Sequence, residues 1–307
     1  VQANPTFDER EPCLLARQPG GRLILSVNPA RELTGTYPDG RREARCEPHL
    51  LQFDTAHPEA APQVIMPVWD RPYDFCEHSY RALAADPECG TLVLTNQAPV
   101  EQDYPHAFSG FSGDGTPLTP GLLRFPMRGC YQQIAVRGHA VSVMAISDEV
   151  EPNPVWRAYK AAQTGQQWDY DFRQLFYTWT PDIRTVPFSP ILTVSSRDET
   201  AGLLRNLDLA VDQHGVAHLL YLDRNIWHAC MRDRFFPDLS IAVALQYVRV
   251  ASGRVIHRET LLQAVEQRTP GQAGTGPFPG PVPEYGVFHT AADGRLFVLS
   301  AQSGREA

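Results

Sequence analysis

Histidine, tyrosine and arginine side chains recur at corresponding places along the chain, each close to the start of a segment that is predicted to be a β-strand. The candidates for acid–base chemistry are His78, Tyr80, Tyr131 and Tyr285, and the candidates for substrate binding beside them are Arg81, Gln133, Arg205 and Asn206. Tyrosine and histidine can take up or give a proton, and arginine or an amide can neutralise a carboxylate. This set suits β-elimination, in which a uronate loses the proton beside its carboxylate.

Two longer segments between predicted strands, 148–172 and 223–240, are rich in aromatic and charged residues. Their candidate substrate-binding residues are Trp156, Trp168, Arg224, Asn225, Trp227 and His228. Aromatic rings stack on the apolar faces of sugars, and arginine pairs with uronate or sulfate. The segments are therefore predicted to line a saccharide cleft. The alternative is that these aromatic residues form small cores that hold the two segments in place.

A glycoside hydrolase would instead need two carboxylates at a defined separation. The available carboxylates are Glu77, Asp148, Asp208, Asp223 and Glu284, and the sequence does not show which of them face each other. His218 lies in the middle of a predicted strand and is interpreted as a packed, structural residue. Three further acids at equivalent turns, Asp86, Asp212 and Asp293, are interpreted as turn formers.

Short hairpins are the elements that must position these residues. In segment 205–221, apolar and polar residues alternate on both sides of an Asp-Gln-His-Gly turn, which predicts two strands joined by a tight turn. Related hairpins are predicted at 13–27, 81–95, 132–147 and 286–300. A repeat is stronger evidence about the fold than any single motif, so the chain is predicted to be built of similar units.

After each of the first four hairpins, the interval to the next hairpin has room for two further strands. These are predicted at 45–53 and 63–68, 106–112 and 117–125, 173–180 and 188–195, and 241–250 and 254–262. Four antiparallel strands, repeated, are typical of β-propeller blades, whereas a β-sandwich, the alternative fold, lacks this longer period. The helix-tolerant run 155–167 is predicted to lie in a loop.

We therefore predict one all-β domain over residues 1–307, a β-propeller of about five units. The units lie near 11–70, 76–126, 130–196, 204–263 and 284–307. The fifth unit has a single hairpin, so the chain is expected to be part of a larger ring, truncated at the C-terminus, or to close its ring in a way that the sequence does not reveal.

Composition narrows the range of partners. The formal net charge is −8 and Lys160 is the sole lysine, which disfavours a nucleic-acid partner. No apolar run approaches the length of roughly 20 residues that spans a bilayer, and no signal peptide is recognised. The six cysteines have no metal-binding or redox spacing and could form three disulfides or remain buried thiols. No cofactor is predicted; a structural calcium or zinc ion and the oligomeric state stay open.

The best hairpin resembles a known repeat. The pattern x-L-x-V-D-x-x-G-x-x-H-L-x-Y is carried by Leu207, Leu209, Val211, Asp212, Gly215, His218, Leu219 and Tyr221. It is similar to the repeats of sialidase-like propellers called BNR repeat proteins, which include carbohydrate-active enzymes and polysaccharide lyases such as the ulvan lyases. The resemblance covers four hairpins, and it implies a secreted or periplasmic propeller that acts on a poly- or oligosaccharide.

Two departures from that family concern sialidase activity. The sialidase Asp-box S-x-D-x-G-x-x-W is only hinted at in segment 112–116, and the Arg-Ile-Pro segment that carries a sialidase's first substrate arginine is absent. Three hypotheses follow: a polysaccharide lyase that uses Tyr, His and Arg, a glycoside hydrolase on the same scaffold, and a propeller that only binds glycan or protein. Because propellers host unrelated functions, the fold cannot choose among them.

Overall fold

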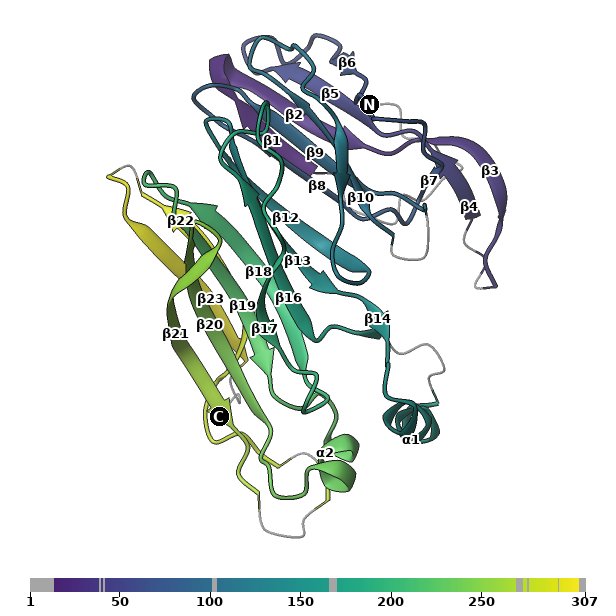
Figure 1. Cartoon of the computed structure of the whole chain (residues 1–307), viewed down its shortest axis with the longest axis vertical. Coiled ribbons are helices and arrows are strands. Elements are labelled where there is room, and N and C mark those ends of the chain that lie inside the picture. The colour runs from purple at the N-terminus through teal and green to yellow at the C-terminus, as the bar shows by residue number, and fades with distance from the viewer. Residues whose placement is uncertain are drawn as a thin grey trace. The chain divides into compact units, whose positions relative to one another are not determined.

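The structure is a computed structural model that describes residues 14–38, 40, 42–100, 104–165, 170–268, 273–274, 276–291 and 293–303. Most of its regular structure is antiparallel β-sheet, with two short α-helices (Figure 1). The chain divides into two compact units. Unit 1 comprises Val1–Val143 and Trp179–Ser189, and unit 2 comprises Met144–Thr178 and Pro190–Ala307.

The first sheet of unit 1 is four-stranded, in the order β1-β2-β5-β6. Its strands are β1 (Leu14–Gln18), β2 (Arg22–Val27), β5 (His49–Asp54) and β6 (Gln63–Ile65). The turn between β1 and β2 is the short 3-10 segment Pro19–Gly21, where Gly20 and Gly21 have positive φ. Glycine adopts this backbone conformation at no steric cost, which is why two of them can close the hairpin.

A small three-stranded sheet, which the sequence analysis did not predict, is inserted between β2 and β8. It contains β3 (Ala30–Thr36), β4 (Arg42–Cys46) and β7 (Phe75–Cys76). The single strand predicted at 45–53 is therefore wrong. The chain leaves β4 at Cys46 and enters β5, in a different sheet, at His49. Pro48 lies in this break, and proline cannot donate a hydrogen bond to continue a strand ladder.

The second sheet of unit 1 has the order β11-β10-β9-β8. Its strands are β8 (Arg81–Ala85), β9 (Leu92–Gln97), β10 (His106–Phe111) and β11 (Gly121–Leu123). An apolar cluster joins the first two sheets. It brings Ile24 and Leu50 of the first sheet together with Leu92, Leu94 and Phe111 of the second.

The third sheet has the order β12-β13-β16-β17. Its strands are β12 (Gly129–Arg137), β13 (Ala140–Ser147), β16 (Gln174–Thr180) and β17 (Leu192–Ser196). Between β13 and β16 the chain forms the two-stranded sheet β14 (Glu149–Val150) and β15 (Tyr170–Asp171), and helix α1 (Pro154–Thr164).

Helix α1 corrects the prediction of a loop at 155–167. The side chain of Asn153 accepts hydrogen bonds from the backbone N–H groups of Val155 and Trp156, and Pro154 occupies the first turn. Gly165 ends the helix in the left-handed conformation, with φ 73°. An Asn cap, an early proline and a terminal glycine are strong helix signals, and they were present in the sequence.

Unit 2 contains a fourth four-stranded sheet and a further hairpin. The strands are β18 (Leu203–Val211), β19 (Ala217–Arg224), β20 (Ala242–Ala251), β21 (Arg254–Val265), β22 (Val282–Thr290) and β23 (Leu296–Ser303). Helix α2 (Ala229–Phe235) lies between β19 and β20. Leu207, Leu220 and Leu245 form an apolar cluster with Phe288 and Val298 of the last hairpin.

The prediction of an all-β chain built of four-stranded antiparallel units is confirmed for four units, while the described part of the fifth forms one hairpin. Asp86 and Asp212 each accept two backbone hydrogen bonds within their turns. Among the described residues no helix is long and apolar enough to cross a membrane. Cys13 lies outside the described residues and the other five cysteines are free thiols, so a three-disulfide pattern is not present.

Candidate functional site

A pocket of about 440 Å³ lies in unit 2, between the fourth sheet and the start of β22. Its lining residues are Leu203, Arg205, Leu222, Arg224, Val243, Val282, Pro283, Glu284 and Tyr285. We call it the arginine pocket. Three residues that the sequence analysis singled out for chemistry, Arg205, Arg224 and Tyr285, thus lie at one place, together with the candidate carboxylate Glu284.

Strand register places the two arginines on one face of the sheet. Arg205 pairs with Leu222, and Leu203 pairs with Arg224, and directly opposed residues on neighbouring strands point to the same side. On this face, Leu207 and Leu220 pack in the apolar cluster against the last hairpin. The arginines therefore lie on the buried face of the sheet. They are at the ends of β18 and β19 that are opposite to the Asp212–Gly215 turn.

Three local features hold β22 beside this face. The backbone N–H of Phe288 donates to Oδ2 of Asp208 at 2.7 Å. At Gly286, a Cβ atom would lie 2.7 Å from a methyl group of Leu220, so the glycine permits the close approach of the two strands. The ladder also shifts register between Pro283 and Tyr285. Such a bulge re-aims side chains, and here Glu284 and Tyr285 both line the pocket.

The polar side chains of the pocket have unused bonding capacity. The Nε of Arg224 donates to the carbonyl of Ile226 at 3.1 Å. Burial lowers the pKa of Arg224, and the nearby Glu266 acts in the opposite direction. The guanidinium remains charged, because the pKa of arginine lies far above neutral pH. In the part of the chain that the structure describes, Arg205, Glu284 and Tyr285 make no side-chain hydrogen bond, and 48% of Tyr285 is exposed. These groups are free to contact a ligand.

The aromatic residues that the structure describes in the two long segments, other than the exposed Tyr170, pack against the protein. Trp156 contacts the apolar cluster of Ile226, Met231 and Ile241, and the guanidinium of Arg173 lies 5.3 Å from its ring centre. Trp168 lies outside the described residues. This arrangement agrees with the alternative in which the aromatics form small cores, and Trp156 does not line the arginine pocket.

Four other predicted binding residues, Trp227, His228, Asn225 and Asn206, also lie outside the arginine pocket. Trp227 stacks on His228 with ring centres 4.7 Å apart, and Lys160 lies over its ring. Asn225 donates to the carbonyl of Ser240 and accepts from the backbone N–H of Ala242, so its amide ties the ends of the α2 segment together. Asn206, a fourth, neighbours Arg205 on β18 and points to the opposite face of the sheet.

In unit 1 the structure brings three of the candidate acid–base residues together. The ring of Tyr80 lies between those of His78 and Tyr131, with centroid distances of 5.0 Å and 4.7 Å. Tyr80 is buried, whereas 49% of Tyr131 is exposed. Tyr131 has a φ of 47°, which is strained for a residue with a side chain, and such strain clusters at functional sites.

The two predicted binding residues near this aromatic group differ in exposure. Arg81 is buried at 6% exposure and pairs with Asn96 across β8 and β9. Gln133 is half-buried on β12, two residues after Tyr131. The aromatic group belongs to unit 1 and the arginine pocket to unit 2, so we treat them as separate candidates.

The sequence analysis missed a buried network of charged side chains beside α1. Lys160 donates to Asp171 at 3.0 Å, and Arg173 contacts both Asp171, at 3.2 Å, and Glu151. All four residues are at most 3% exposed. Burial raises the pKa of Asp171 to about 7, and the hydrogen bond with Glu151 adds to the rise while Arg173 opposes it. The one available signal was the presence of a single lysine in the chain.

Several of the carboxylates considered for hydrolysis have structural partners. Glu77 accepts from the hydroxyl of Tyr37 at 2.5 Å, Asp223 pairs with Arg197, and Asp208 holds β22. Glu284 is the single carboxylate among the described residues that line the arginine pocket. Within the described ranges, no group of three or more His, Cys, Asp or Glu residues could hold a metal ion.

Comparison with known proteins finds similarity of fold. No family model matches the sequence, and no curated protein matches it. An α-L-arabinanase from Penicillium chrysogenum, in complex with arabinobiose, aligns with a TM-score of 0.50 and 11% identity over 96% of this chain and 78% of that chain. An ulvan lyase from a new family of polysaccharide lyases, bound to -[GlcA(1-4)Rha3S]-, aligns with a TM-score of 0.51 and 9% identity.

The alignment with the ulvan lyase covers 92% of this chain but 62% of that chain, so this chain spans less than two thirds of the lyase's length. At these identities the likeness concerns the fold alone. The neighbours place the four-stranded sheets in the architecture of an arabinanase and an ulvan lyase.

Proposed function

We propose that the protein is a carbohydrate-active enzyme built on a β-propeller, secreted or periplasmic, that cleaves an acidic polysaccharide by β-elimination in the arginine pocket. The observation that carries the proposal is the meeting of two arginines and a half-exposed tyrosine over an apolar floor. The likeness of fold to an arabinanase and to an ulvan lyase supports a carbohydrate as the substrate.

In the proposed reaction, the guanidinium of Arg205 pairs with the uronate carboxylate, and Arg224 contributes positive charge from the pocket wall. This charge stabilises the carbanion that forms when the carbon beside the carboxylate loses its proton. Tyr285 is the proposed base that takes that proton. The bond from the neighbouring carbon to the bridging oxygen then breaks, a carbon–carbon double bond remains, and the leaving oxygen takes up the proton that Tyr285 has accepted.

The floor of the pocket suits a sugar ring. Leu222 and Val243 are buried apolar side chains, and the apolar face of a sugar can rest on such a surface while its polar edges meet the arginines. His78, Tyr80 and Tyr131 remain predicted acid–base residues of unit 1, with Arg81 and Gln133 beside them. Their roles are tested by separate substitutions from those of the arginine pocket.

Hydrolysis is less well supported, because a glycosidase of the common type requires two carboxylates near the scissile bond. Among the described lining residues the pocket offers Glu284 alone. A hydrolase would therefore depend on Glu284, whereas the proposed lyase would not.

The test is to incubate the purified protein with uronate-containing and sulfated polysaccharides, and to measure reducing ends together with the ultraviolet absorbance of unsaturated products. We expect both signals to rise together, and the Glu284→Gln variant to retain them. Reducing ends without unsaturated products, lost in Glu284→Gln, would indicate a hydrolase. A folded protein that is silent in both measurements would favour a propeller that only binds.

A further inference from the structure

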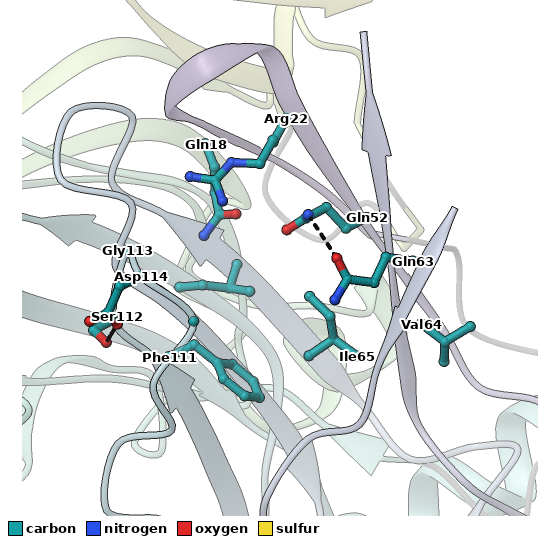
Figure 2. A pocket seen from close by; sticks show the side chains of 12 residues that line it. Gln18, Arg22, Gln52, Gln63, Val64, Ile65, Phe111, Ser112, Gly113 and Asp114 are labelled. Atoms are coloured by element: carbon teal, nitrogen blue, oxygen red, sulfur yellow. Dashed lines mark hydrogen bonds between the residues drawn. The ribbon is translucent and has the colours of Figure 1, made fainter. Parts of the chain in front are cut away.

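A second pocket, of about 270 Å³, lies within unit 1 between its first and second sheets. Three glutamines line it, Gln18, Gln52 and Gln63, and we call it the amide pocket. Figure 2 shows that these side chains, together with Arg22, direct their polar ends toward one space. None of these residues belongs to the proposed active site, and the inference below does not rest on the proposed function.

Strand register explains why the glutamines meet. Gln18 pairs with Arg22 across β1 and β2, Ile24 pairs with Gln52 across β2 and β5, and Gln52 pairs with Gln63 across β5 and β6. Ile24 packs in the apolar cluster against the second sheet, so the glutamines lie on the same buried face. This face changes from apolar to polar as it approaches the Pro19–Gly21 turn.

The floor of the pocket is apolar and closed. Leu92 is 1% exposed and Phe111 is 6% exposed, and both come from the second sheet. Ile65, from β6, packs against the same cluster. An apolar floor beneath a polar rim fits a ligand that has one apolar face and several polar edges.

The walls of the pocket are held in position before any ligand binds. The Nε2 of Gln18 donates to the carbonyl of Gly90 at 2.7 Å, and Gln18 is 5% exposed. Gly113 lies so close to Cys89 that a Cβ atom there would overlap the Cys89 carbonyl oxygen. The turns at 86–90 and 112–115 therefore pack closely against each other beside Gln18, and a preorganised wall lowers the entropic cost of binding.

The turn at 112–116, which carries the hint of an Asp-box, supplies a fixed acceptor. The Oγ of Ser112 donates to Oδ1 of Asp114 at 2.5 Å, and the backbone N–H of Thr116 donates to the same oxygen at 2.9 Å. These hydrogen bonds lower the pKa of Asp114 to about 2, and the bond from Ser112 has the largest effect. Arg22 lies among the other lining residues, so one positive and one negative charge offset each other in the pocket.

We propose that the amide pocket binds a neutral sugar unit. The Nε2 of Gln52 donates to Oε1 of Gln63 at 3.4 Å, which leaves the Oε1 of Gln52 as an acceptor and the Nε2 of Gln63 as a donor. An acceptor and a donor held side by side match two adjacent hydroxyl groups. Because the charges of Arg22 and Asp114 offset each other, the pocket is not expected to favour an anionic ligand over a neutral one. Its volume, just below the usual range of ligand sites, suits a single ring.

The experiment is saturation-transfer NMR on the full chain with L-arabinose, D-xylose, L-rhamnose and D-galactose as probes, and D-glucuronate as the charged counterpart. We expect at least one neutral sugar to receive saturation, and the Gln52→Leu/Gln63→Leu variant to weaken its binding at least tenfold. Leucine keeps the volume of the side chain while it removes both amides. Gln213→Leu, at an exposed turn of unit 2, is the matched control and should bind as the unchanged protein does.

A second substitution guards against loss of folding. Gln63 is exposed, so Gln63→Ala should leave the unfolding temperature unchanged and still weaken neutral-sugar binding. The proposal is overturned if none of the neutral sugars receives saturation, if Gln63→Ala and the double variant bind as tightly as the control, or if binding is lost in Arg205→Gln instead. The last result would assign the sugar to the arginine pocket.

Discussion

The arginine pocket and the amide pocket arise in the same way but differ in charge. Each lies at one end of the packed interface between a four-stranded sheet and its neighbour, and each continues a strand face that is apolar further in. In unit 2 that face ends in Arg205 and Arg224, whereas in unit 1 it ends in Gln18 and Gln52. The apolar part holds the sheets together, and the terminal residues set the chemistry of the pocket.

The largest expected effect tests whether the arginine pocket is catalytic at all. Tyr285→Phe removes one hydroxyl, and loss of a general base typically costs a factor of about 10² to 10⁴ in rate. We expect kcat to fall at least about a hundredfold, measured as the appearance of unsaturated product. Tyr104→Phe, a tyrosine of unit 1 that is 39% exposed, is the matched control and should keep full activity. Equal activity in both variants would remove Tyr285 from the mechanism.

A second substitution gives the arginine pocket an uncharged amide like those that line the amide pocket. Arg205→Gln exchanges a charged donor for an amide, and hydrogen bonds to charged groups contribute about 1.5–3 kcal/mol. We expect kcat/KM for an acidic polysaccharide to fall roughly ten- to a hundredfold, since 1.4 kcal/mol corresponds to a factor of ten. Arg17→Gln, an exposed arginine on β1, is the control. An unchanged kcat/KM in Arg205→Gln would contradict carboxylate recognition by this side chain.

A third prediction concerns the support of the arginine pocket. Gly286→Ala would bring a methyl group into contact with the buried Leu220, and overpacking of this kind costs about 1–3 kcal/mol. The free energy of unfolding should fall by that amount in chemical denaturation, and activity should fall with it as β22 moves. Gly280→Ala is the matched control, because a Cβ atom there meets nothing within 4 Å. If both variants unfold at the same denaturant concentration, β22 is not tightly held.

The smallest expected effect compares the buried carboxyl group of Asp171 in unit 2 with the exposed carboxyl group of Asp114 in unit 1. The pKa of Asp171 in unit 2 is raised to about 7 from 3.8, whereas that of Asp114 in unit 1 is lowered. Between about pH 4 and 7 the folded protein keeps a proton on Asp171 that the unfolded chain has released. The contribution of this group to stability is therefore complete below its unfolded pKa and is lost as the pH rises through 7.

Urea unfolding at several pH values measures this difference. In the Asp171→Asn variant, the free energy of unfolding should decline less steeply from pH 4 to pH 7, by at most about 1.4 kcal/mol per pH unit for one proton. Asp238→Asn, at an exposed position, should leave the slope unchanged. A slope that Asp171→Asn does not alter would mean that the carboxyl group is ionised throughout this range.

The sequence predicted the repeated hairpins because their signals are local. Alternation around the Asp212–Gly215 turn specifies two strands without reference to the rest of the chain. The break at Pro48 is also visible in the sequence, since proline cannot continue a strand ladder, and it divides segment 45–53 between two sheets. The signals for helix α1 are local too, since Asn153 caps its start and Gly165 ends it, although the run 155–167 is predicted to be a loop.

The two pockets differ in how far the sequence could reveal them. Arg205 and Tyr285 stand out in the sequence because they lie at the start of predicted strands, and Arg224 because it lies in the aromatic and charged segment 223–240. The glutamines of the amide pocket carry no such signal, since an uncharged polar residue on a strand is ordinarily solvent-facing. Their meeting depends on cross-strand register and on the packing of two sheets, which single-sequence patterns do not specify.

The sole lysine of the chain, Lys160, is 2% exposed and bonded to Asp171. The folded protein therefore exposes no lysine side chain to a reagent that acylates amines. Apart from the N-terminal amine, such a reagent can reach an amine only when α1 detaches from the protein and exposes Lys160. The rate of acylation at this one position becomes a direct measure of how often that helix detaches. A single mass increment, mapped to Lys160, would report local opening without any engineered label.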